Sequence, residues 1–237
     1  MADVQTPDNL EMAEISQTRS LSYSLVILPF TALPDPGFAE TVLDNGFISI
    51  LERLTQTMEL PEDISSGARL MLEYLRAWPV SEISGLSEAL GVERTRLYRG
   101  VAPGYGPPPP FEAVWTTRND TVTKILQSLA EVYRRSGMAL TAELRERPDS
   151  ISVELEFQRQ LVLREEEFWR KHASKKAREC IRQQLAFLTE HLAAWVPRFI
   201  EEALLQAQTG FYRGHLTMLR GFLADEQDYL QTLLNDS

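Results

Sequence analysis

The sequence predicts an all-α protein that folds as one helical domain. Apolar residues recur every three to four positions through most of the chain, which is the pattern of one buried helix face. Prolines and glycines fall mainly between these periodic segments, where helices begin and end. The stretch SLSYSLVIL at 20–28 alternates as a strand would, but no partner strand is visible elsewhere, so we predict a helix there as well.

The first third of the chain is expected to form two further helices after the loose N-terminus and the helix at 20–28. Residues 1–18 are acidic and polar, and we expect them to be flexible or loosely packed. Residues 38–58 carry one continuous apolar stripe and are predicted to form a single helix. Pro61 separates this helix from a second one at 64–78, which Pro79 ends.

Residues 81–100, SEISGLSEALGVERTRLYRG, resemble a DNA-binding helix-turn-helix. In that interpretation ALGV is the turn, and Arg94, Arg96 and Arg99 lie on a recognition helix. Three glutamates in the same segment balance the arginines, and the chain has a net charge of −10. Affinity for DNA depends on neutralising phosphates, so a transcription regulator is the alternative rather than the favoured function.

The segment 100–110, GVAPGYGPPPP, contains four consecutive prolines. Such a run is extended and does not enter a helix or a central strand. It is either a linker between domains or a fixed loop over the surface. Because the apolar helices on both sides look too incomplete to fold separately, we predict a functional loop within a single domain that spans 1–237.

Two amphipathic helices follow the loop. The first covers 120–137, with Asp120 as a candidate N-cap and Gly137 placed to end it. The second lies in 146–161, where Ser150 is a suitable N-cap residue. Because carboxylates are favoured near a helix start, capping alone explains part of the acidic character of this segment.

The last third of the chain also reads as helices. The dense charge run at 164–179 is predicted to be the solvated face of a helix. A helix at 181–195 follows, and Pro197 is expected to begin the next one. A final pair of helices is predicted around 211–223 and 229–233.

The sequence offers no recognisable metal, nucleotide or hydrolase motif. A phosphate-binding GxxxxGK[ST] loop, a GxGxxG turn and a GxSxG elbow are all missing, and the single cysteine, Cys180, permits no internal disulfide. The three histidines are too far apart in the sequence to suggest zinc binding. We therefore predict no cofactor and no metal. A helical hydrolase that uses Glu146, Asp149 and Glu154 with a bound metal is a third hypothesis.

Charge and hydropathy indicate where the protein works and what it binds. The N-terminus lacks the basic start and apolar stretch of a secretory signal, and no apolar run is long enough to span a bilayer. We therefore predict a cytoplasmic location without stable membrane insertion. A net charge of −10 repels phosphate backbones and attracts basic peptides, so no nucleic-acid partner is expected.

Three segments, VERTRLYRG at 92–100, YGPPPPFEAVW at 105–115 and ERPDSISVELEFQRQL at 146–161, together resemble the TorD/DmsD/NarJ family of molybdoenzyme maturation chaperones. Each segment matches a family motif in part, and their order and spacing add to the resemblance. The matching residues are Leu97, Tyr98 and Gly100 in the first segment, Pro110, Phe111 and Glu112 in the second, and Glu146 and Asp149 in the third.

The chain departs from the family motifs at four positions. Arg94 stands where an aromatic residue is usual, and Ala113 replaces a serine. Pro148 lies one place later than the motif's proline. Ser150 replaces a histidine, and since serine does not titrate near neutral pH, no proton-linked role is expected at that position.

The resemblance implies a single all-helical domain of the TorD/DmsD type and a cytoplasmic chaperone rather than an enzyme. It implies that the chain binds the twin-arginine signal peptide and the apo form of a molybdopterin oxidoreductase subunit. Binding would assist cofactor insertion before export. A monomer and a homodimer are both compatible with the resemblance.

A receptor for such a leader needs an apolar groove with carboxylates at one end. The candidate carboxylates for the leader's arginines are Glu112, Asp149 and Glu154. Core packing is the alternative role for the aromatic candidates, and helix capping and loop fixing are the alternative for Glu146 and Asp149. The candidate peptide-binding residues are Leu97, Tyr98, Pro110, Phe111, Glu112, Trp115, Glu146, Asp149, Ser150 and Glu154.

Overall fold

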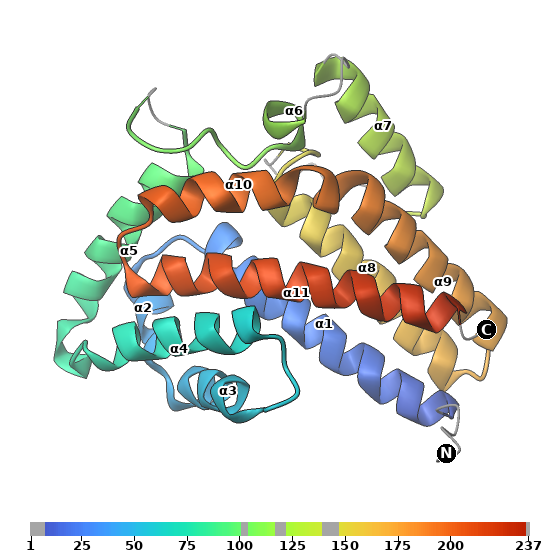
Figure 1. The fold of residues 1–237 in the computed structure, drawn as a ribbon, viewed down its shortest axis with the longest axis horizontal. Coiled ribbons are helices and arrows are strands. Elements are labelled where there is room, and N and C mark those ends of the chain that lie inside the picture. Colours follow the sequence, from blue (N-terminus) through green and yellow to red (C-terminus); the bar gives the residue numbers. More distant parts are fainter. Residues whose placement is uncertain (1–7, 101–103, 117–121, 139–146, 236–237) are drawn as a thin grey trace.

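The computed structural model describes residues 8–100, 104–116, 122–138 and 147–235, and in these ranges the regular structure is helical, as predicted (Figure 1). An isolated antiparallel bridge joins Phe111 and Ser150. The helices are α1 Asn9–Thr31, α2 Pro36–Leu43, α3 Asn45–Gln56, α4 Glu62–Arg76, α5 Ile83–Tyr98, α6 Glu112–Trp115, α7 Val122–Arg135, α8 Ile151–Arg170, α9 Ser174–Phe187, α10 Ala193–Gln206 and α11 Gly210–Asn235.

The core lies between α11 and the helices on either side of it. Helix α11 packs along α4, α1 packs along α8, and α8 packs along α9 (Figure 1). One hydrophobic cluster runs from α1 to α11 and includes the fully buried Tyr23, Trp195 and Tyr212. No described helix is long and apolar enough to cross a membrane.

Helix α1 confirms the helical prediction for 20–28, but the expectation of a loosely packed N-terminus is wrong for residues 9–18. These residues form the first half of α1, and Met12 and Ala13 are buried in the core. Asp8 caps the helix by accepting hydrogen bonds from two backbone N–H groups of its first turn. Residues 1–7 lie outside the described part of the chain.

The single helix predicted for 38–58 is two helices, α2 and α3, that meet at Asp44. This residue is extended, with φ −63° and ψ 144°, and its carboxylate accepts a hydrogen bond from Gly46 N at 2.7 Å. Asp44 is therefore an N-cap. The apolar periodicity continues across the break, which explains why it predicted one helix. The helix predicted at 64–78 is confirmed as α4.

The segment 81–100 does not form a helix-turn-helix. After one 3₁₀ turn at Val80–Glu82 it is a single helix, α5, and Gly91 of the supposed turn lies within it. Arg94 of the supposed recognition helix hydrogen-bonds the carbonyl oxygens of Pro29 and Phe30 at the end of α1. The DNA-binding alternative therefore loses the turn on which it depends.

The described part of the proline-rich loop, 104–110, lies against the end of α5. Gly100 has φ +57°, and a Cβ there would lie 2.6 Å from Cδ of Pro109. A Cβ on Gly106 would collide with the carbonyl oxygen of Arg96. Both glycines allow a backbone approach that no larger residue permits. The segment is thus packed on the helix; residues 101–103 lie outside the described ranges.

The predicted caps of the two following helices have different outcomes. Ser150 caps α8, since its hydroxyl accepts a hydrogen bond from Val153 N at 3.4 Å, as predicted. Helix α7 ends before Gly137, which has φ +68°, also as predicted. The prediction that Asp120 caps α7 falls outside the described residues.

The charge run at 164–179 is not one solvated helix face. Helix α8 ends at Arg170, α9 begins at Ser174, and His172 between them has φ +55°. Glu165 of this run is fully buried. The many charged residues of this segment therefore gave no sign of the boundary between α8 and α9 or of the buried position of Glu165.

The last helices are longer than predicted. Helix α9 continues through a π turn at Leu188–Leu192 into α10, so Pro197 lies inside α10 and does not begin it. Figure 1 shows α9 and α10 running in different directions, as expected where a π turn and a proline interrupt the helical hydrogen bonds. The predicted final pair is one continuous helix, α11.

Candidate functional site

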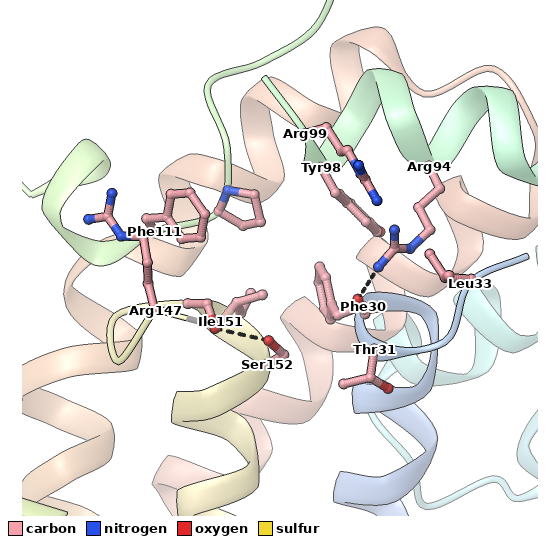
Figure 2. Close-up of a pocket in the computed structure, with 12 residues that line it drawn as sticks. Phe30, Thr31, Leu33, Arg94, Tyr98, Arg99, Phe111, Arg147, Ile151 and Ser152 are labelled. Atoms are coloured by element: carbon pink, nitrogen blue, oxygen red, sulfur yellow. Dashed lines mark hydrogen bonds between the residues drawn. The ribbon is translucent and has the colours of Figure 1, made fainter. Parts of the chain in front are cut away.

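A pocket of about 390 Å³ lies where the end of α1, the end of α5, the proline-rich loop and the start of α8 meet (Figure 2). It draws residues from all three segments singled out in the sequence, 92–100, 105–115 and 146–161. Its lining consists of Phe30, Thr31, Leu33, Arg94, Tyr98, Arg99, Pro110, Phe111, Arg147, Ser150, Ile151 and Ser152.

Backbone hydrogen bonds fasten the loop to the start of α8. Glu112 N donates to the carbonyl of Asp149 at 2.8 Å, and Ile151 N donates to the carbonyl of Pro110 at 3.1 Å. These bonds surround the isolated bridge of Phe111 with Ser150. Two segments about forty residues apart thereby form one continuous wall of the pocket.

The floor of the pocket is anchored to the last helix. The Tyr98 hydroxyl lies 3.1 Å from Nδ1 of His215, and Nε2 of His215 lies 2.9 Å from the carbonyl oxygen of Val26. Since a carbonyl only accepts, Nε2–H is the donor and Nδ1 accepts from Tyr98. Burial lowers the pKa of His215 to about 4, so the imidazole is neutral at physiological pH.

Asp149 is fully buried behind the pocket wall. Its carboxylate accepts hydrogen bonds from Arg147 Nε at 2.9 Å, Arg147 Nη2 at 2.8 Å and Ala113 N at 3.2 Å. The Arg147 guanidinium also stacks on the Phe111 ring, 4.5 Å from its centroid. Asp149 therefore orients Arg147 and Phe111 in this conformation.

Glu112 and Glu154 are also buried and bonded inside the protein. Glu112 Oε2 lies 2.9 Å from Nδ1 of His191, and Glu154 Oε2 accepts from Trp195 Nε1 at 3.1 Å. The other oxygen of Glu154 has no hydrogen-bond partner among the described residues. Burial, together with the nearby Glu112 carboxylate, raises the pKa of Glu154 well above its ordinary value.

The ten predicted site residues thus fall into three groups. Four line the pocket: Tyr98, Pro110, Phe111 and Ser150. Five lie buried and outside its lining: Leu97, Glu112, Trp115, Asp149 and Glu154. Glu146 lies outside the described residues. Two of the buried side chains support the wall directly: Asp149 bonds Arg147, and Trp115 donates its indole N–H to the carbonyl of Pro109 at 2.9 Å.

The end of α1 and Arg147 also line this pocket, which was not predicted from the sequence. Phe30, Thr31 and Leu33 enter the pocket from the end of α1, far from the three motifs in the sequence. No local signal places them there. Arg147 had a signal that went unused, because an arginine two residues before Asp149 is positioned to pair with it.

The lining of the pocket is positively charged, whereas the groove expected from the sequence was negatively charged. Three arginines and no acidic side chain are found among the described lining residues. The three carboxylates predicted for a basic leader face the protein interior. This pocket alone is therefore not the acidic receptor that the sequence suggested.

A second pocket of about 590 Å³ lies along α5. It contains Glu88, Val92, Glu93 and Tyr105, and Val92 and Tyr105 are 58% and 52% exposed. Glu93 accepts from the N–H groups of residues 208 and 209 and also pairs with Arg96, the one cation of the described lining, at 3.1 Å. Glu88 is exposed. This pocket combines apolar surface with an accessible carboxylate.

The described residues include no group of three or more His, Cys, Asp or Glu side chains that could hold a metal ion. Asp149 and Glu154, which the hydrolase hypothesis required, have separate hydrogen-bond partners.

Comparisons with known proteins agree on one family. A family model described as nitrate reductase delta subunit matches residues 59–201. A chaperone protein TorD of Vibrio vulnificus is 25% identical over 122 residues, which are 51% of this chain and 55% of that protein. The TorD chaperone of Photobacterium profundum is 30% identical over 105 residues, 44% of this chain and 45% of its own. The matched segments thus span about half the length of these curated relatives.

Proposed function

Because this chain belongs to the nitrate reductase delta subunit family, the TorD/NarJ family of molybdoenzyme maturation chaperones, we propose that it binds the twin-arginine signal peptide of a molybdopterin oxidoreductase. The family consists of chaperones, not enzymes. In this proposal the client is the apo form of an oxidoreductase subunit, held in the cytoplasm until its cofactor is inserted. The chaperone acts as a monomer or a homodimer.

One observation supports this proposal more than any other. The three segments that carry the family resemblance are separate in the sequence, yet all contribute to the lining of one pocket. Backbone bonds and the Asp149–Arg147 pair hold its wall in place. A preorganised surface of this kind reduces the entropy lost when a flexible peptide binds.

We assign the apolar part of the leader to this first pocket. Tyr98, Pro110 and Phe111 offer apolar and aromatic surface there, and Leu33 stands at the edge with 60% of its area exposed. Ser150 adds a hydroxyl to the same wall. These side chains fit a short apolar peptide segment.

The leader's arginines belong elsewhere, because the arginines of the first pocket would repel them. The second pocket lies along the same helix, α5, and presents Glu88 beside the exposed Val92 and Tyr105. We propose that the peptide follows α5 with its basic end toward Glu88. The buried Glu112, Asp149 and Glu154 then act by holding the pocket wall.

Two substitutions test this placement. Leu33→Ala removes exposed apolar surface from the first pocket, and Glu88→Gln removes the charge from the second. Each is expected to weaken binding of a synthetic twin-arginine leader about tenfold, equivalent to about 1.4 kcal/mol. Isothermal titration calorimetry with the full chain measures both, and the Glu88 effect should shrink as salt is added.

Matched controls exist in the same molecule. Leu205 on α10 is 81% exposed and lies outside both pockets, and Glu73 on α4 is also exposed. Leu205→Ala and Glu73→Gln should bind the leader as the parent does. Equal affinity in the Leu33 and Leu205 variants would remove the first pocket from the peptide site.

A further inference from the structure

The first pocket is a local exception to the charge of the protein. The chain has 34 acidic and 24 basic residues and a net charge of −10. Arg94, Arg99 and Arg147 nevertheless line this pocket, with no aspartate or glutamate among its described lining residues. A positive concavity in an acidic protein concentrates anions locally.

Two of the three arginines keep an uncompensated charge. Arg147 is neutralised by Asp149 at 2.8 Å. Arg94 donates only to backbone carbonyls, those of Pro29 at 3.4 Å and Phe30 at 2.5 Å. The Arg99 side chain is exposed and makes no hydrogen bond or ion pair with another described residue. In the described ranges, neither guanidinium has a carboxylate partner.

The opposite side of the pocket favours the same sign of ligand. Figure 2 shows Arg94 and Arg99 projecting from α5 and Ile151 and Ser152 at the start of α8 facing them across the pocket. The start of a helix carries a partial positive charge, which stabilises anions. Ser150 and Ser152 also belong to the lining, and their hydroxyls lie 3.0 Å apart, within hydrogen-bonding distance of each other.

The rest of the lining sets the size and polarity of the ligand. Phe30 and Tyr98 supply apolar surface next to the arginines (Figure 2). Pro110 belongs to the same lining. A volume of about 390 Å³ is at the lower end of the range for small-molecule sites. Guanidinium groups match the planar oxygens of carboxylates and the oxygens of phosphates.

We propose that this pocket binds a metabolite-sized organic oxyanion, whose carboxylate or phosphate group lies between Arg94, Arg99 and the start of α8. The inference rests on the arginines of the lining and not on the proposed leader binding. Because both ligands are assigned to this pocket, an oxyanion is expected to compete with the apolar part of the leader. Carboxylate and phosphate share the chemistry that the pocket recognises, so the test includes one probe of each kind.

The experiment titrates the full chain, at low ionic strength, with sodium malonate and with sodium pyrophosphate in separate calorimetric runs. Saturable binding of at least one probe is expected, and the tighter one identifies the preferred oxyanion. Arg99→Glu should weaken it at least about tenfold, since it replaces an attractive charge by a repulsive one. Arg99→Gln should give a smaller loss in the same direction.

Arg69 provides the matched control. It is an exposed arginine on α4, outside the pocket, and Arg69→Glu makes the same change in net charge. The Arg69 variant should bind the probe as the parent does. The proposal fails if neither probe binds saturably at up to about 10 mM, or if the Arg99 and Arg69 variants bind equally. Thermal melting by circular dichroism checks that both variants fold, as expected for exposed side chains.

Discussion

Glu154 shows how the environment of one side chain changes its role. It was expected to pair with an arginine of the leader, yet it is fully buried and one of its oxygens has no partner. Burial raises the pKa of this carboxyl well above its ordinary value, and the neighbouring Glu112 raises it further. A carboxyl held in the neutral form attracts no cation, so its place is in the wall of the pocket.

This raised pKa gives a stability that depends on pH. The folded protein retains a proton on Glu154 that the unfolded chain releases above a pKa of about 4.3. The contribution of this carboxyl to the free energy of unfolding is therefore fully present below that pH. Above it, the contribution falls by up to about 1.4 kcal/mol per pH unit until the pH reaches the pKa of Glu154 in the folded protein. Glutamine cannot titrate, so Glu154→Gln should gain stability relative to the parent between pH 5 and pH 8, as measured by urea unfolding.

Glu167→Gln is the control for that comparison. Glu167 is exposed, and its hydrogen bond and ion pair with Lys171 lower the pKa of its carboxylate. The Glu167 carboxylate is ionised in the folded and the unfolded protein throughout this pH range. The difference in free energy of unfolding between Glu167→Gln and the parent should therefore stay constant with pH. A constant difference for the Glu154 variant as well would show that the Glu154 carboxyl is not held protonated.

The same residues show which parts of the site were predictable. Ser150 was recognised as a cap because its partner, Val153, lies three residues away in the sequence. The partners of Glu112 and Glu154 lie 79 and 41 residues away, in His191 and Trp195. Burial by a distant helix leaves no local mark, so the sequence could not separate pocket-lining side chains from supporting ones.

At the scale of helices, α4 and α11 approach each other through glycine. A Cβ placed on Gly67 would lie 2.5 Å from the carbonyl oxygen of Gly214 and 2.6 Å from Met218 N. A Cβ on Gly214 would collide with the carbonyl oxygen of Gly67. The two backbones are therefore in direct contact, and any side chain at either glycine separates the helices.

Gly67→Ala should lower the free energy of unfolding by at least about 2 kcal/mol, because backbone atoms cannot move aside as a flexible side chain can. Urea denaturation of the purified variant measures this loss. Gly91→Ala is the matched control, since the nearest atom to its added Cβ is the carbonyl oxygen of Pro34, at 3.9 Å.

Gly91 lies within α5, and alanine has the higher helix propensity, so Gly91→Ala should raise the free energy of unfolding by up to about 1 kcal/mol. A loss of stability there would contradict the single helix that replaces the supposed helix-turn-helix. A Gly67 variant as stable as the parent would contradict the close crossing of α4 and α11.

Helix content was largely predictable and helix boundaries were not. Periodicity found the apolar faces of α4, α7 and α8, since burial on one side imposes that pattern directly. It missed the break at Asp44, where a cap interrupts the helix without interrupting the pattern. It also placed a helix start at Pro197, where the chain instead continues through a π turn.

At the scale of the whole molecule, Arg19 connects α1 with three other helices. Its guanidinium donates to Glu165 of α8 at 2.8 Å, to Gln184 of α9 at 2.5 Å and to Glu226 of α11 at 2.6 Å. The buried Glu165 also accepts from Ser16 at 2.9 Å. This network replaces apolar packing at a point where four helices meet.

Arg19→Met keeps much of the volume of the side chain but leaves two buried carboxylates facing each other. We expect a loss of about 3–5 kcal/mol in the free energy of unfolding. Arg220→Met is the comparison, because Arg220 pairs with Asp63 at 2.7 Å on a partly exposed surface. That change should cost no more than about 1 kcal/mol. Similar losses in urea unfolding of the two variants would mean that burial adds nothing to the Arg19 network.

The hydrogen bond from Tyr98 to His215 has a consequence for the growing polypeptide. All segments that line the first pocket lie within residues 30–152, and they leave the ribosome before α11 is made. Since a chain folds progressively during its synthesis, the pocket segments exist for a time without the histidine that fixes their floor. The pocket therefore reaches its final form only after the last helix docks, and a partly synthesised chain does not yet hold it in this geometry.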